Sequence, residues 1–333
     1  MIKSLARSAL FSLALLPGVA AAEPITLKFA YFSSDQSTSY RLAVKPFVDA
    51  VNARGGVNIE TYIGGSLGKE QSQQALLVRN GIADIAFVSL GPTGNQFPDN
   101  SVMELPGLFK DSREATLVLT RLIASGIMRG YDEFFVVGAF STEPESIHTR
   151  PPIATLDDLQ GKRIRANNPI EADVLAKLGM SPVVLPIVKT PEAISRGTVD
   201  GAATATNPLI DFGLGRVVTY HYFLFLGPST QVILMNRKKF ESLPKADQEV
   251  IREYSGEWLA ARYIERYRPT DSGLMALLES DPQRKVIFPS SAELDVANRA
   301  FKAIVSQWAA ASSHNQKLLD AVGAELRQLR SAP

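Results

Sequence analysis

Two short patterns in the chain contain residues that could do chemistry: a serine among glycines and a cluster of basic side chains. The run Gly64-Gly65-Ser66-Leu67-Gly68 matches G-x-S-x-G, in which a hydrolase places its serine on a sharp turn between strand and helix. A secreted serine hydrolase using Ser66 also needs a histidine, and His148 and His221 follow it in the chain. The same glycines equally suit an ordinary turn that leads into a helix. We favour the turn and keep the hydrolase as the alternative.

The histidines do not form a metal-binding pattern, because His148, His221 and His314 lie at no short ligand spacing from one another. The chain has no cysteine, so thiolate ligands are excluded. Neither the P-loop pattern nor the G-x-G-x-x-G dinucleotide pattern is present. We therefore expect no metal and no cofactor. His148 is the best placed of the three for a ligand contact, since it comes just after a predicted strand.

The basic cluster consists of Lys162, Arg163 and Arg165 on one predicted strand. Strand alternation sends Arg163 and Arg165 to one face and Lys162 to the other. Arg165 stands at the end of the strand, just before a loop, where ligand groups usually bind. Its guanidinium is permanently charged and planar, and it matches a carboxylate in bidentate geometry. Arg165 is therefore a candidate carboxylate anchor.

The elements that must position these residues alternate between strand and helix, which is the pattern of sheets covered by helices. Residues 25–32 alternate like a strand, and the apolar residues of 40–52 have helical spacing. Pro269 should kink or break a long helix that starts at 244. The predicted strands are 25–32, 57–63, 83–89, 133–140, 161–166, 181–185, 199–205, 231–236 and 285–288, and the predicted helices are 40–52, 69–79, 113–132, 171–178, 190–196, 244–265, 272–278, 294–310 and 315–329.

The first 22 residues have the pattern of a secretory signal peptide. Lys3 and Arg7 precede a nearly all-apolar run, and Ala20-Ala21-Ala22 supplies an A-x-A cleavage site. No later run is long enough to span a bilayer. The 35 basic and 34 acidic residues almost balance, and no basic stripe suggests a nucleic-acid partner. We expect an exported, periplasmic protein cleaved after about Ala22.

The chain resembles the DctP-type solute-binding proteins of tripartite ATP-independent periplasmic (TRAP) transporters over essentially its whole mature length. The resemblance starts from D-L-x-G-x-x-x-R, whose arginine is Arg165. It extends to further motifs in a characteristic order and spacing: Gly65-Ser66-Leu67-Gly68, Gly81-Ile82-Ala83-Asp84-Ile85-Ala86-Phe87, Leu105-Pro106-Gly107-Leu108-Phe109, Gly197-Thr198-Val199-Asp200-Gly201, Asn207-Pro208 and Met235-Asn236.

This resemblance implies a two-domain α/β fold of the periplasmic-binding-protein type. Each domain would hold a mixed or parallel sheet flanked by helices, with the ligand cleft between them. We expect residues 23–143 with about 230–268 to form domain I, and residues 144–229 with about 269–333 to form domain II. The hinge is expected near residues 140–146 and 227–235. The implied function is capture of an organic acid and its delivery to TRAP permease subunits, by a protein that is a monomer and not an enzyme.

The resemblance also implies roles for particular residues. The family's arginine at the position of Arg165 binds the ligand carboxylate, and its Asn-Pro helps to hold the ligand. Asn207 follows the Asp-Gly strand with three more residues than in the sialate-binding branch, so Ala205 or Thr206 could take that place instead. That branch has a second arginine where this chain has Glu145, so a ligand with two anionic groups is disfavoured.

The remaining walls of the cleft are expected from loops at strand ends, where small ligands usually bind. These candidates are Phe32 and Ser34 after the first strand and Phe87 and Ser89 at the end of the third. Aromatic side chains there would suit a flat or hydrophobic acid. One arginine is compatible with sugar acids, aromatic acids, keto acids and dicarboxylates alike, and the absence of a second favours monocarboxylates.

Overall fold

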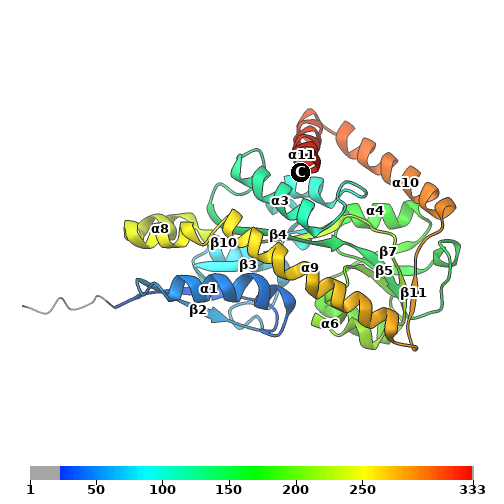
Figure 1. The fold of residues 1–333 in the computed structure, drawn as a ribbon, viewed down its shortest axis with the longest axis horizontal. Coiled ribbons are helices and arrows are strands. Elements are labelled where there is room, and N and C mark those ends of the chain that lie inside the picture. Colours follow the sequence, from blue (N-terminus) through cyan, green and yellow to red (C-terminus); the bar gives the residue numbers. More distant parts are fainter. Residues whose placement is uncertain (1–22, 332–333) are drawn as a thin grey trace, which may run out of the picture.

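The computed structural model describes residues 23–331, and the predicted signal peptide and its cleavage site lie outside this range. Two β-sheets lie side by side with helices on their outer faces (Figure 1). Both sheets are mixed, so the predicted α/β class is confirmed. Among the described helices, none combines the length and apolar character needed to cross a membrane.

The first sheet has the strand order β2-β1-β3-β10-β4. β1 pairs in parallel with both β2 and β3, whereas β10 is antiparallel to β3 and β4. The chain therefore returns to this sheet late, as the apolar run before residue 236 predicted. The strands are β1 (Ile25–Ala30), β2 (Val57–Tyr62), β3 (Ile85–Ser89), β4 (Phe134–Pro144) and β10 (Pro228–Asn236).

The second sheet has the order β11-β9-β5-β8-β6-β7. Two of its strands, β5 and β9, were not predicted, because each is only three or four residues long and joins the sheet through partners distant in sequence. His148 lies within β5 rather than after a strand. The strands are β5 (Ser146–Thr149), β6 (Arg163–Ala166), β7 (Ser181–Val184), β8 (Gly201–Thr204), β9 (Tyr220–Tyr222) and β11 (Lys285–Ile287).

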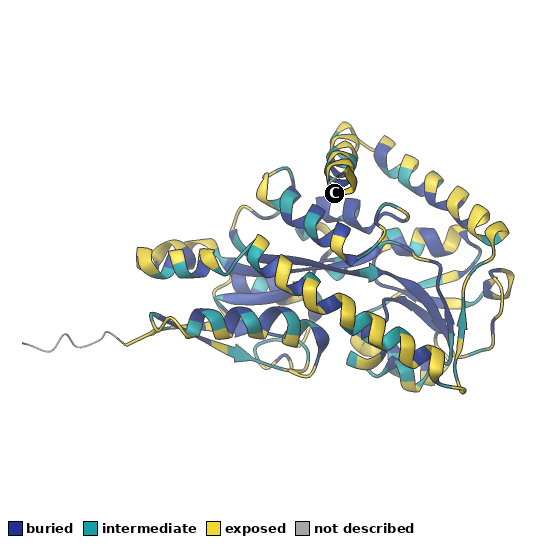
Figure 2. Ribbon diagram, viewed as in Figure 1, coloured by how far each residue is buried: buried dark blue, intermediate teal, exposed yellow. Residues whose placement is uncertain are grey.

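The helices cover the outer faces of both sheets, and their exposed sides alternate with buried ones (Figure 2). Short 3-10 turns lie between several of them, among them η4 (Pro98–Glu104) and η6 (Ile187–Lys189). The α-helices are α1 (Lys45–Asn52), α2 (Gln74–Arg79), α3 (Ser112–Ala124), α4 (Pro169–Lys177), α5 (Thr190–Ser195), α6 (Asn207–Asp211), α7 (Arg237–Ser242), α8 (Lys245–Glu253), α9 (Glu257–Ser280), α10 (Ser291–Ala310) and α11 (Ser313–Ser331).

The predicted break at Pro269 is wrong, because α9 runs through it without interruption. The interruption lies earlier, between the end of α8 at Glu253 and the start of α9 at Glu257. Gly256, with a φ of 59°, stands directly before α9. A proline inside a helix removes one backbone hydrogen bond. Burial of Tyr263 and Tyr267 before it and of Leu278 after it holds both halves in place.

Within residues 23–331, the chain passes between the sheets near Glu145, before β10 and along α9. β4 passes into β5 through Glu145, and the segment before β10 returns beside it, with Glu145 N donating to Gly227 O at 3.2 Å and Leu226 N donating to Glu145 O at 2.7 Å. The third crossing is α9, which contacts β4 of the first sheet and β11 of the second. The domain boundaries stay a prediction, and the packing of α11 on α3 favours placing that last helix with the first sheet.

Candidate functional site

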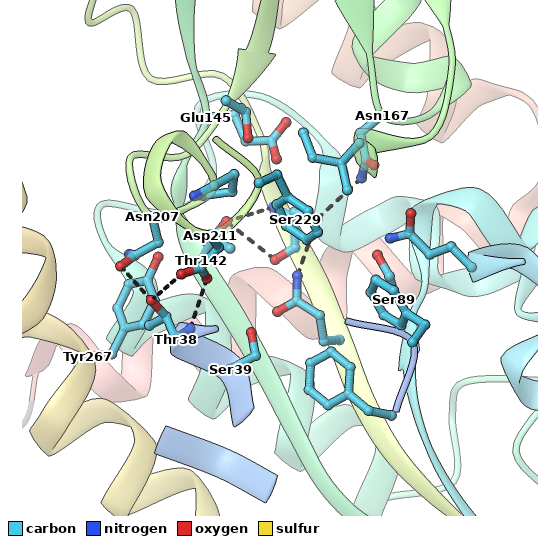
Figure 3. A pocket seen from close by; sticks show the side chains of 18 of the residues that line it. Thr38, Ser39, Ser89, Thr142, Glu145, Asn167, Asn207, Asp211, Ser229 and Tyr267 are labelled. Carbon is cyan, nitrogen blue, oxygen red and sulfur yellow. Dashed lines mark hydrogen bonds between the residues drawn. The ribbon is translucent and has the colours of Figure 1, made fainter. Parts of the chain in front are cut away.

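A cavity lies between the two sheets at the carboxyl ends of several strands. The space between its lining side chains is about 600 Å³, part of which is open to solvent. Figure 3 shows the polar part of its wall. The lining residues are Phe32, Thr38, Ser39, Gln71, Phe87, Ser89, Thr142, Glu145, Arg165, Asn167, Ile187, Thr204, Asn207, Pro208, Asp211, Phe212, Ser229, Gln231, Tyr263 and Tyr267.

Arg165, on β6, is 1% exposed and yet lines this cavity. Its guanidinium donates from Nε to Leu185 O at 2.9 Å, from Nη1 to Ala203 O at 3.1 Å and from Nη2 to Asn167 Oδ1 at 2.9 Å. All three acceptors are neutral, and an arginine has five N–H groups. Two N–H groups therefore stay available for a ligand after the hydrogen bonds within the described chain are counted.

Arg163 has a different environment, although strand alternation predicts the same face. It begins β6 at the surface, where Nη2 lies 2.9 Å from Asp200 Oδ1 and the side chain is about half exposed. Arg165 lies two residues further along, where the ends of β7 and β8 cover it through the carbonyls of Leu185 and Ala203. Only the second arginine is thus placed to meet a ligand in the cavity.

Asn167 links this wall to the first sheet. Its Nδ2 donates to Ser229 Oγ at 3.2 Å, and Gln231 Nε2 donates to the same oxygen at 3.3 Å. Ser229 and Gln231 lie on β10, so the hydrogen bonds join the two halves of the cavity wall. Asn167 also orients Arg165, which makes it part of the same polar network.

Three glutamates surround the Arg165 end of the cavity. Burial raises the pKa of Glu104 to about 8, and the neighbouring charge of Glu171 adds to this effect. Burial, together with the nearby Glu171, raises the pKa of Glu145 well above its usual range. Glu171 Oε2 accepts from Asn167 N at 2.6 Å, while its Oε1 has no hydrogen-bond partner among the described residues. Burial lowers the pKa of Arg165, with both Glu171 and Glu145 opposing that effect.

At the other end of the cavity, Thr38 connects the two sheets directly. This residue follows β1, and its backbone N and Oγ1 donate to the Asp211 carboxylate on α6 at 2.9 and 3.0 Å. Oγ1 also donates to Asn207 Oδ1 at 3.3 Å, as Figure 3 shows. Burial raises the pKa of Asp211, and the hydrogen bonds from Thr38 partly offset this. We call Thr38, Asn207 and Asp211 the latch.

Five of the predicted site residues meet at the cavity: Arg165, Asn207, Ser89, Phe32 and Phe87. The other three are placed elsewhere. Ser34 is exposed and accepts from Gln36 N in its own turn. Thr206 is buried with its hydroxyl 4.0 Å from Met275 Sδ, so Asn207 rather than Thr206 faces the cavity. Whether the five contact a ligand stays a prediction.

His148 is fully buried in the second sheet and does not line the cavity. Its Nδ1 lies 2.9 Å from His221 Nδ1, and its Nε2 lies 3.2 Å from Thr204 O. His221 Nε2 lies 3.4 Å from Arg284 Nη1. Burial lowers the pKa of His148 to about 3 and that of His221 to about 4, with neighbouring positive charge contributing. Both rings are therefore neutral structural groups.

The hydrolase alternative fails on this geometry. Ser66 is exposed in the turn after β2, in the first sheet, whereas His148 and His221 are buried in the second. All four ring nitrogens of these histidines face partners other than Ser66. The glycines serve the turn: Gly64 and Gly65 have φ of 66° and 71°, and an added Cβ at Gly65 would crowd the backbone of Lys69.

Sequence reasoning missed several residues of the cavity wall. The latch residues Thr38 and Asp211 belong to no recognised motif. Tyr263 and Tyr267 lie on α9, far along the chain from the strand ends at which the cavity wall was expected. The spacing of Tyr263 and Tyr267 could have indicated a shared surface, because residues four apart lie on one face of a helix. Glu145 was noticed only for the arginine it replaces.

Comparison with known proteins adds to this geometry. The family model for bacterial extracellular solute-binding proteins, family 7 (DctP), matches residues 29–311. A solute-binding protein of Verminephrobacter eiseniae is 26% identical over 228 residues, which is 65% of this chain and 66% of that protein.

Two solved structures share the fold. One is a marine metagenome TRAP solute-binding protein in complex with metahydroxyphenylacetate (TM-score 0.84, 24% identity, 91% of this chain and 99% of that one). The other is a TRAP solute-binding protein from Haemophilus influenzae with bound L-gulonate (TM-score 0.81, 20% identity, 90% and 99%). These relatives are solute receptors and not enzymes. The chain belongs to the DctP family of bacterial extracellular solute-binding proteins, family 7, whose members serve TRAP transporters.

Proposed function

We propose that this protein captures an organic acid in the cavity between its sheets, with the ligand carboxylate bound by Arg165. The observation that carries the proposal is a buried guanidinium that lines the cavity and has only neutral hydrogen-bond acceptors. Burying a charge without a directly paired counterion is costly. A ligand carboxylate would supply that counterion in bidentate geometry.

The ligands of the related structures support this assignment. Metahydroxyphenylacetate and L-gulonate are both carboxylates, one aromatic and one a sugar acid. The cavity of this chain offers Phe32, Phe87 and Phe212 as apolar wall and Gln71 and Gln231 as polar wall. Such a wall suits either kind of acid, with the carboxylate as the shared feature.

Delivery to TRAP permease subunits is the second part of the proposal. It rests on family membership, since the family's solute receptors serve TRAP transporters. It also accords with export to the periplasm through cleavage after about Ala22. A monomer with two sheet-containing halves would present the loaded cavity and close or open it by hinge bending.

A thermal-shift screen of organic acids followed by calorimetry tests the binding proposal. A ligand present at 100 times its dissociation constant stabilises the folded state by about 2.7 kcal/mol. We expect carboxylates to raise the melting temperature and their amides or esters to leave it unchanged. A screen in which neutral analogues bind as well as the acids would contradict the carboxylate anchor.

A further inference from the structure

Gln71 is a buried side chain of the cavity wall whose acceptor has no donor within the described chain. It lies in the 3-10 turn η2 (Gln71–Gln73), is 5% exposed and lines the cavity. Its buried Oε1 has no hydrogen-bond partner among residues 23–331. Buried polar atoms normally have a partner, because leaving one unpaired costs free energy. The wall is therefore missing a hydrogen-bond donor at Gln71.

Two other glutamines of this region have a structural role. Gln74 Nε2 donates to Gly68 O at 2.8 Å, and Gln96 Nε2 donates to Ser72 O at 3.1 Å. Their Oε1 atoms also lack partners, but neither residue lines the cavity. Backbone carbonyls thus hold both amides in place. The carboxamide of Gln71 has no such bond to a described residue and is the one of the three at the cavity.

Other polar side chains of the cavity wall already use their donors within the protein. Asn167 Nδ2 and Gln231 Nε2 both donate to Ser229 Oγ, at 3.2 and 3.3 Å. Thr142 Oγ1 donates to Glu143 O at 2.8 Å. Because these protons are committed, a molecule that enters the cavity is the better source of a donor for Gln71.

Gln71 and Arg165 come from opposite halves of the cavity. η2 packs against β3 of the first sheet, whose last residue, Ser89, also lines the cavity. Arg165 lies on β6 of the second sheet. Figure 3 shows Ser89 across the cavity from the latch. The terminal torsion of a glutamine varies broadly, so a turn of the carboxamide presents Oε1 to the cavity. A ligand held by Gln71 and Arg165 must reach from one sheet to the other.

From these observations, and resting on the proposed function, we infer that the ligand is a hydroxy acid whose hydroxyl donates to Gln71 Oε1 while its carboxylate binds Arg165. A hydroxyl supplies the donor without adding charge. It lies away from the carboxylate, on the part of the ligand that reaches the first sheet. A site that hydrogen-bonds a hydroxyl rejects the analogue lacking it, because its own buried polar group is then left unpaired. Gln71 is thus a specificity-determining residue.

Matched series of acids test this inference on the wild-type protein by calorimetry at pH 7. Each series compares a parent acid with its hydroxy isomers and with the methyl ether of each isomer, which keeps the acceptor but loses the donor. The parents are benzoate, phenylacetate and hexanoate, and a further series compares gluconate with its single-deoxy derivatives. We expect an acid with a hydroxyl remote from the carboxylate to bind about tenfold or more tightly than its parent and its ether.

Gln71→Met then separates the role of this side chain from that of the rest of the cavity. The variant replaces the carboxamide with an apolar side chain of similar length. The affinity for the best hydroxy acid should fall by about tenfold or more, to that of its parent, while the parent and the ether should bind unchanged. Gln73→Met is the matched control, because Gln73 belongs to the same turn but is exposed and does not line the cavity. It should leave all affinities unchanged.

The outcomes are distinguishable from failure of the proposed function. If parents and ethers bind as well as the hydroxy acids, the inference is overturned while carboxylate capture stands. A preference for the hydroxyl that persists in Gln71→Met, or one confined to a hydroxyl beside the carboxylate, overturns it as well. If no acid of any series binds, both proposals fall. The wild-type comparison needs no variant, so a misfolded Gln71→Met does not protect the inference.

Discussion

The second sheet buries polar side chains in two places, in its middle and at the cavity. The hydrogen bonding of these two groups differs. In the middle of the sheet, His148 and His221 have a partner for every ring nitrogen. At the cavity, Arg165 keeps two N–H groups free of partners within the described chain. Both places are almost free of solvent exposure.

We expect this difference in hydrogen bonding to separate structural polar groups from groups that bind a ligand. A buried polar group normally finds its partners within the protein, because leaving it unpaired costs about 1–3 kcal/mol. The histidine pair obeys that rule and stabilises the sheet. Arg165 departs from it at the cavity surface, where a ligand can supply the partners. Substitutions in the two places should therefore affect different quantities.

The largest effect on binding is expected for Arg165→Ala. Removing one partner of a buried charged pair costs about 2–5 kcal/mol, which is a loss of roughly 30-fold to several thousand-fold in affinity. Arg165→Lys keeps the charge but loses the planar fork, so its loss should be milder. Calorimetry on the folded variants with the best acid from the screen measures both. An affinity of Arg165→Ala within threefold of wild type would place the anchor elsewhere.

His148→Leu should change stability instead of binding. The substitution leaves His221 Nδ1 and Thr204 O without partners, which should lower the free energy of unfolding by about 2–4 kcal/mol. Urea unfolding measures this change, and calorimetry should find the ligand affinity within threefold of wild type. Weakened binding at unchanged stability would mean that the histidine pair, too, belongs to the binding site.

Acidification should destabilise the protein through the same pair. The pKa of His148 is lowered to about 3 and that of His221 to about 4, whereas an unfolded histidine titrates near 6.5. The unfolded state then binds more protons, so this stability is present above about pH 6.5 and is lost as the pH falls toward 4. Glu104, with its pKa raised to about 8, has the opposite trend, since its contribution is lost as the pH rises toward 8.

Comparing wild type with His148→Leu isolates the histidine contribution, because Glu104 is common to both proteins. The difference between their unfolding free energies should shrink by about 2–3 kcal/mol between pH 6.5 and 4, at 1.36 kcal/mol per pKa unit. Urea titrations at several pH values follow it. A difference that stays constant with pH would show that burial does not hold His148 neutral.

A smaller effect is expected at the latch. Thr38→Val removes the hydroxyl hydrogen bonds to Asp211 and Asn207 but keeps the backbone donor. The hydroxyl carries one proton, which the two acceptors share, and such a hydrogen bond contributes on the order of 0.5–1.5 kcal/mol. Affinity should therefore fall about two- to tenfold. Small-angle scattering should find a larger radius of gyration without ligand and a smaller one with it. Thr38→Ser keeps the hydroxyl and serves as the control, and an unchanged radius in all states would contradict hinge closure.

The smallest effect is expected for Arg163→Ala. This side chain forms a half-exposed ion pair with Asp200, and such pairs contribute up to about 1 kcal/mol. Stability should change by no more than that, and ligand affinity should stay within threefold of wild type. Because Arg163 lies two residues from Arg165 on one strand, a large loss of binding here would show that the two arginines act together.

The sequence by itself determined the fold class, the family and the position of Arg165, the candidate carboxylate anchor, at a strand end. Alternation and helical spacing are local properties, so nine strands and most helices follow from nearby residues. The motifs from Gly65 to Asn236 identify the family in the same way. The short strands β5 and β9 escaped prediction because their stability comes from partners elsewhere in the sheet.

Tertiary structure alone decided which polar groups lack partners. Arg163 and Arg165 look alike on one strand, and only the packing of β7 and β8 buries the second. His148 was the one histidine expected to contact a ligand, and only the sheet shows that its ring nitrogens face His221 and Thr204 instead. Burial and hydrogen-bond satisfaction depend on residues far apart in the chain, and no local pattern records them. That is why the Thr38–Asp211 latch and the N–H groups of Arg165 that lack partners among the described residues emerge from the fold and not from the sequence.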